Sequence, residues 1–77
     1  MEDLINFLLE PLVTDIKKVK IEKSQDGKNT HFTLNIPKED IAKVIGKNGK
    51  MIKSIKNLVK IRAIKENSFV SIDVAEL

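Results

Sequence analysis

The sequence predicts an α+β fold in which a three-stranded sheet packs on helices. Apolar residues recur at three- and four-residue spacing in three segments, which is typical of amphipathic helices. In three other segments apolar and polar residues alternate, which indicates strands with one buried face. These segments follow one another in the order α-β-β-α-α-β. With 77 residues the chain has room for one small domain, which we expect to span 1–77.

The first predicted helix lies at the start of the chain. Its apolar positions are Leu4, Ile5, Leu8, Leu9 and Leu12. Glu2 and Asp3 suit the first turn because the amino-terminal end of a helix dipole is positive. Pro11 leaves two possible endings: the helix stops near Glu10, or it kinks and continues to about Val13.

Two strands are predicted next, joined as an antiparallel hairpin. Asp26-Gly27 lies between them, and this dipeptide tolerates the positive φ angles of a tight turn. The apolar residues of the two strands are Val19 and Ile21 in the first, and Phe32, Leu34 and Ile36 in the second.

Two helices and a last strand complete the predicted fold. Pro37 suits the first position of a short helix that ends at Gly46. A longer helix is expected from about Lys50 to Lys65, and a strand from Phe69 to Val74. The predicted core face of the long helix consists of Ile52, Ile55, Val59 and Ala63, flanked by Met51; that of the strand consists of Val70, Ile72 and Val74.

Charge is distributed unevenly along the chain. Residues 41–65 carry eight bases and no acid, whereas residues 1–16 carry four acids and no base. The basic block is a candidate surface for a polyanion, and a solvated lysine face is the alternative that charge alone leaves open. The chain has no cysteine and no metal-ligand spacing, so neither a metal site nor a cofactor is expected.

The turn Gly46-Lys47-Asn48-Gly49 is the one motif that carries chemistry. Its glycines permit a sharp reversal and close approach of another backbone. The first amides of the following helix lack partners within the helix, so they can donate hydrogen bonds to a phosphate, with Lys47 and Lys50 adding positive charge beside it. We expect Lys43 and Lys53 to add a flanking positive field. The predicted aliphatic walls of a groove for bases are Ile41, Val44, Ile45 and Ile52.

This motif resembles the signature I-G-x-x-G-x-x-I of the KH domains: it reads I-G-K-N-G-K-M-I, preceded by Val44 and followed by Lys53-Ser54-Ile55. The expected order of elements is that of the type II KH fold, and a domain of this length is similar to the small bacterial KH proteins of the KhpA (YlqC) type. The resemblance implies an RNA chaperone or adaptor whose G-x-x-G loop clamps about four nucleotides of single-stranded RNA. It also implies a homodimer, and pairing with a larger KH-containing protein of the Jag type.

Two other functions remain open at this point. A helix-hairpin-helix-like module would grip the backbone of duplex DNA, although that motif usually spaces its glycines by one residue. In the other alternative the chain is a protein-interaction subunit whose partner carries the RNA binding. That reading depends on a second apolar face of the long helix, formed by Leu58, Ile61 and Ile64, which we expect either to complete the core or to form a dimer seam.

Nothing in the sequence indicates an enzyme or a membrane protein. His31 is the only histidine, and no acidic or nucleophilic residue is expected beside it. No apolar run approaches the roughly 20 residues that span a bilayer, and the acidic start of the chain favours a cytoplasmic location. With no Tyr or Trp and only three Phe, the chain also lacks an obvious platform for stacking bases.

Overall fold

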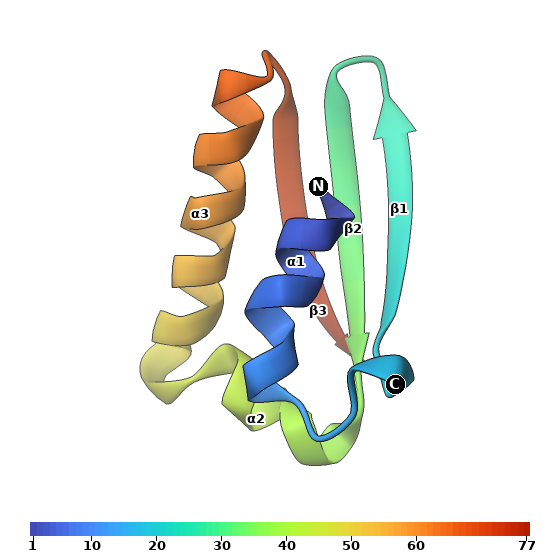
Figure 1. Cartoon of the computed structure of the whole chain (residues 1–77), viewed down its shortest axis with the longest axis vertical. Helices are drawn as coiled ribbons and strands as arrows, with labels where there is room; N and C mark the ends of the chain where they lie inside the picture. Colours follow the sequence, from blue (N-terminus) through green and yellow to red (C-terminus); the bar gives the residue numbers. More distant parts are fainter.

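The computed structural model describes all residues from 1 to 77 and confirms the order α-β-β-α-α-β. Figure 1 shows α1 in front of the sheet, with α3 beside it and α2 below. The elements are α1 (Glu2–Leu9), β1 (Lys20–Asp26), β2 (Asn29–Ile36), α2 (Lys38–Ile45), α3 (Lys50–Lys65) and β3 (Phe69–Glu76).

The end of α1 combines the two possibilities left open by the sequence. The α-helix ends at Leu9, and the chain continues for one 3₁₀ turn over Glu10–Leu12. Pro11 explains the change, because its nitrogen carries no hydrogen to bond the carbonyl one helical turn earlier.

The sheet has the order β1-β2-β3. β1 and β2 form the predicted antiparallel hairpin, in which Asp26 lies opposite Asn29, and Gly27 takes the positive φ of 61° that the turn requires. β2 and β3 are parallel, with Phe32 opposite Ile72. Parallel neighbours need a long crossover, and here α2 and α3 provide it.

The core lies between the helices and the inner face of the sheet. Alternation along β2 buries the three residues that the pattern assigned to the core, and the predicted core face of α3 is confirmed at Ile55, Val59 and Ala63. Met51, expected to flank that face, is 39% exposed. The core cluster is Ile5, Leu9, Phe32, Leu34, Ile36, Val44, Ile55, Val59 and Ile72.

One buried carboxylate ties α2 to the segment between α1 and β1. Asp40, in the first turn of α2, is only 1% exposed. Its Oδ2 accepts a hydrogen bond from the backbone N–H of Thr14 (3.1 Å), and its Oδ1 accepts one from the Thr14 hydroxyl (2.8 Å). These two bonds from Thr14 lower the pKa of Asp40 and outweigh the opposing effect of burial, and Lys43 and Lys18 lower it slightly further. The start of α2 is therefore held in place by a charge-assisted contact.

We predict that this contact makes the fold sensitive to acid. A carboxylate whose pKa is lower in the folded state stabilises it above the unfolded-state pKa, and this stabilisation is lost as pH falls through the folded-state value. Asp40→Asn should lower the melting temperature by several degrees at neutral pH. The difference from the unsubstituted protein should then shrink below the ordinary aspartate value of 3.8.

Thermal melts followed by circular dichroism between pH 7 and pH 3 check this prediction. Asp26→Asn is a suitable control because the Asp26 carboxylate is exposed and has no hydrogen-bond or ion-pair partner. A difference between the Asp40→Asn variant and the unsubstituted protein that stays constant down to pH 3 would contradict the assigned role.

Candidate nucleic-acid interface

The turn between α2 and α3 is built from residues with unusual backbone angles. Gly46, Asn48 and Gly49 have φ values of 76°, 56° and 72°, a region that only glycine and, to a lesser degree, asparagine enter readily. The Gly46 N–H bonds the Ala42 carbonyl at 2.9 Å, and the Gly49 N–H bonds the Gly46 carbonyl at 3.2 Å. The turn therefore closes by its own backbone contacts.

The two glycines are required for different reasons. A Cβ atom on Gly46 would lie 2.5 Å from the Met51 Cβ and 2.9 Å from the Met51 nitrogen, so only glycine lets α2 end this close to the start of α3. A Cβ atom on Gly49 would meet nothing within 4 Å. Gly46 thus allows the two helices to approach, and Gly49 leaves open space above the turn for the backbone of a ligand.

The start of α3 presents free positive potential at this turn. No side chain caps the start of α3. The Lys50 N–H bonds the Lys47 carbonyl, and the dipole of the 16-residue helix adds to the attraction of this end of the helix for an anion. Lys43, Lys47, Lys50 and Lys53 are all exposed around the turn. None of the four lies within 4 Å of a carboxylate: the close contacts of basic side chains with acids are Arg62–Glu66 and the His31–Asp73 contact. This arrangement suits a phosphate group.

The predicted aliphatic walls are only partly accessible. Ile45 is exposed, and Ile41 and Ile52 are half-buried. The expectation that Val44 lines the groove is wrong. Val44 is fully buried in the core, so it supports the turn from inside and does not contact a ligand. Sequence reasoning missed Met51, whose exposed side chain begins α3 next to Gly46. Five hollows of the surface are lined by other residues, and the three isoleucines give the turn an aliphatic flank.

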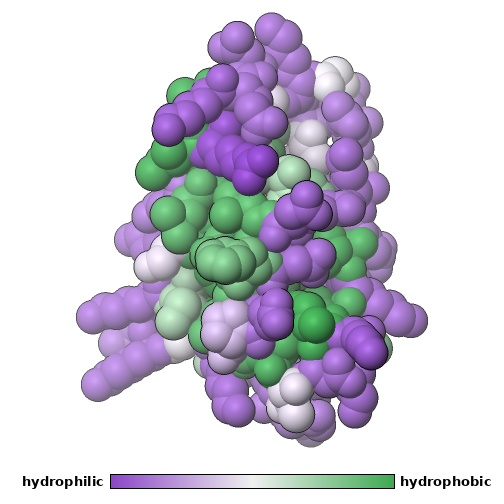
Figure 2. Space-filling model, viewed as in Figure 1, coloured by the Kyte–Doolittle hydropathy of each residue, from purple (hydrophilic) through white to green (hydrophobic).

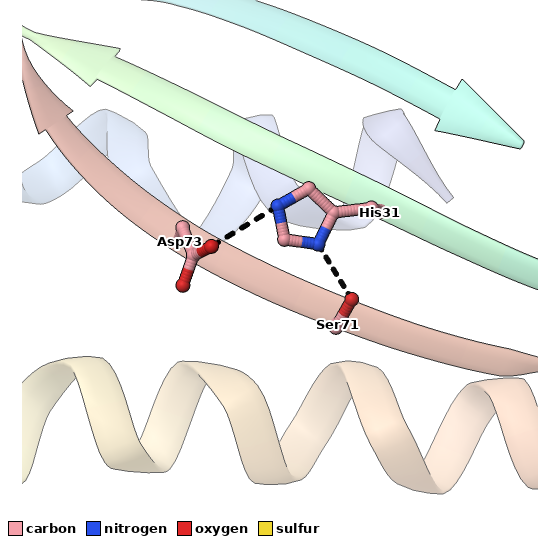
Figure 3. Close-up of polar contacts among 3 residues, drawn as sticks. All are labelled: His31, Ser71 and Asp73. Carbon is pink, nitrogen blue, oxygen red and sulfur yellow. Dashed lines mark hydrogen bonds and ion pairs between the residues drawn. The ribbon is translucent and has the colours of Figure 1, made fainter.

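His31 is not isolated, contrary to the expectation from the sequence. Its Nδ1 lies 2.6 Å from the Ser71 Oγ, and its Nε2 lies 3.1 Å from the Asp73 Oδ2 (Figure 3). The parallel register of β2 and β3 brings these residues together. The three lie on the solvent-exposed face of the sheet. Backbone amides in a sheet point along the sheet toward neighbouring strands, so the backbone of this flat face donates no hydrogen bond to a ligand above it.

The second apolar face of α3 does not complete the core. Leu58, Ile61 and Ile64 are 49%, 54% and 60% exposed, which removes one of the two alternatives left by the sequence. Phe7 on α1 is exposed as well. Figure 2 shows apolar surface gathered over α1 and the adjoining side of α3. No helix of the chain has both the length and the apolar content needed to cross a bilayer.

Residues 2–74 match the protein family described as "KhpA/KhpB, KH domain". The chain belongs to this KH family. The RNA-binding protein KhpA of Clostridium perfringens is 32% identical over 96% of this chain and 99% of its own length. The proteins of the same name from Chlamydia caviae and Listeria monocytogenes are 33% and 32% identical, each over 99% of this chain. Chain and KhpA relatives therefore correspond over almost their whole lengths, and the KH fold expected from the sequence is confirmed.

The close approach at Gly46 generates a stability prediction for this KH loop. Gly49→Ala should destabilise the protein by about 1 to 2 kcal/mol, because alanine is strained at positive φ. Gly46→Ala should lower the free energy of unfolding by about 1 to 3 kcal/mol more than Gly49→Ala does, since its new methyl group also overlaps Met51. Urea denaturation of both variants measures the difference. Equal losses would mean that backbone strain alone, and not the approach of the helices, requires glycine at Gly46.

Proposed function

We propose that this protein binds single-stranded RNA without catalysing a reaction, as an RNA chaperone or adaptor in post-transcriptional regulation. One observation carries the proposal: the glycine turn places the amino-terminal end of α3, which no side chain caps, beside four unpaired, exposed lysines. The relatives carry the name RNA-binding protein KhpA, which supports RNA as the ligand of this turn. The proposal places the protein in the bacterial cytoplasm, where RNA is made.

Each group at the turn has a distinct role in this proposal. Phosphates of the RNA backbone approach over Gly49, where no side chain obstructs them, and accept hydrogen bonds from the first amides of α3. Lys47 and Lys50 contact the phosphates directly, and Lys43 and Lys53 supply the surrounding positive field. Unstacked bases rest on Ile41, Ile45 and Ile52, with the exposed side chain of Met51 extending that surface.

We expect charge reversal at the tip of the turn to abolish RNA binding. The variant carrying Lys47→Asp and Asn48→Asp places two carboxylates where phosphates should lie, and aspartate tolerates the positive φ of Asn48. Affinity for a single-stranded RNA of about ten nucleotides, measured by fluorescence anisotropy, should fall at least about tenfold, with little change in melting temperature.

The chain offers a matched control at Lys56-Asn57, the same dipeptide on the exposed side of α3. Lys56→Asp with Asn57→Asp makes the same change in charge away from the turn, and it should weaken binding far less. Equal losses of RNA affinity in both variants would show that binding depends only on the overall charge of the protein.

In the unsubstituted protein, a footprint of about four phosphates predicts that the logarithm of the RNA affinity falls with the logarithm of the salt concentration with a slope of about −3. Tighter binding to duplex DNA of equal length would favour the helix-hairpin-helix-like alternative.

We further propose that the exposed face of α3 mediates homodimerisation. Leu58, Ile61 and Ile64 form a contiguous apolar row that water contacts in the single chain, and burying such a row against its own copy about a two-fold axis removes it from solvent. A dimer would carry two RNA-binding turns, which raises the avidity for a long RNA. The same face is our proposed contact for a larger KH-containing protein of the Jag type.

Substituting the central residue of this row provides the test. Ile61→Asp should convert the dimer to a monomer in sedimentation velocity, because a charge buried in an apolar seam is strongly unfavourable. Leu77→Asp is the control, since Leu77 is comparably exposed but lies at the end of the chain, away from α3. A dimer that survives Ile61→Asp would rule out this seam.

A further inference from the structure

The sheet face that points away from the helices contains a polar hollow. Alternation along the strands directs Ser24, Asp26, Asn29, His31, Phe69 and Ser71 to this face, and these residues line a hollow of about 200 Å³ between the β1–β2 turn and the start of β3. It lies at the far end of α3 from the glycine turn (Figure 1). A helix of 16 residues separates the two places by about 24 Å.

The imidazole ring of His31 is held in one orientation on this face. Figure 3 shows the ring over β3, with one nitrogen directed at Ser71 and the other at Asp73. A ring bonded through both nitrogens cannot rotate freely, so its planar surface is ordered before any ligand arrives. Pre-ordering of this kind reduces the entropy lost on binding.

Phe69 supplies a second planar group on the same face. Its side chain is 67% exposed, and it lies opposite Asn29, whereas His31 lies opposite Ser71. Phe69 and His31 are therefore diagonal neighbours on adjacent strands, with Cα atoms about 7 to 8 Å apart. Planar side chains at this spacing on a sheet are suited to stacking with unpaired bases.

The charged groups around the hollow favour a base over a phosphate. Asp26 lines it directly, and Asp73 and Glu22 lie on the same face. Two lysines are also near, Lys20 on the same face of β1 and Lys28 beside Phe69, so the three carboxylates leave this face with a net negative charge that disfavours a polyanion. An ionised carboxylate only accepts hydrogen bonds, so Asp26 suits a base that presents two adjacent donors. Among the RNA bases, guanine alone has two such donors, N1–H and N2–H, on its Watson–Crick edge.

We propose that this hollow binds an unpaired guanine base of RNA, which stacks on Phe69 and His31 and donates hydrogen bonds to Asp26. The site rests on the proposed RNA-binding function and adds base selectivity to it. Because the two contact places lie far apart, an RNA of about four nucleotides reaches only the turn, whereas one of about twelve reaches both. Guanine selectivity should therefore depend on RNA length.

The experiment compares four RNAs by fluorescence anisotropy: a uridine tetramer, a uridine dodecamer, and two dodecamers that carry one guanosine, near the 5′ end or near the 3′ end. The unsubstituted protein should bind one of the guanosine-containing dodecamers about tenfold more tightly than the uridine dodecamer, a gain typical of one stacked base. Phe69→Ala and Asp26→Asn should each remove that gain and leave the affinity for the tetramer unchanged. Leu77→Ala, at another exposed apolar residue, should preserve it.

The outcomes separate this site from the function on which it rests. If the protein binds no RNA, the proposed function fails. If it binds all dodecamers equally, or if both variants keep the guanosine preference, the RNA-binding function stands and the guanine site is wrong. If Phe69→Ala reduces dimerisation in sedimentation velocity and leaves the guanosine preference intact, the face is a protein interface, which also overturns the proposal.

Discussion

The missing side chain at Gly46 is the constraint on which the candidate site depends. Only without a Cβ atom can the end of α2 approach the Met51 backbone, and that approach makes the connection between the two helices short. The amino-terminal end of α3, which no side chain caps, then lies at the turn, and no acid lies close enough to pair with the lysines of the turn. The Asp40–Thr14 contact holds the other end of α2. The loop is thus fixed through the helix that precedes it and the helix that follows it.

Charge and apolar surface are divided among different parts of this small molecule. The acids of residues 1–16 belong to α1 and its connection to β1, and the eight bases of residues 41–65 belong to α2, the turn and α3. The apolar row of α3 lies on the same helix as several of these bases but is exposed in the single chain. One helix can therefore present its first turn to a polyanion and a later apolar row to a protein surface, because the two features lie in different segments of the helix.

The parallel pairing of β2 with β3 creates the second functional candidate. It places His31 beside Ser71 and Asp73, residues about forty positions later in the chain. It also places Phe69 on the same face, so a chain with no Tyr and no Trp still presents two planar side chains on one sheet. The contacts of both His31 ring nitrogens hold that ring in one orientation on the exposed face.

The sequence by itself determined the elements, their order, most of the core, and the glycine turn with its lysines. These features depend on local patterns: apolar periodicity, proline and glycine positions, and charge within a few residues. Only the tertiary structure decided that Val44 is buried, that Leu58, Ile61 and Ile64 remain exposed, and that His31 has partners on β3. The physical reason is that burial and strand register depend on which distant segments pack against each other. A local pattern shows that a face is apolar, but it does not show which segment covers that face.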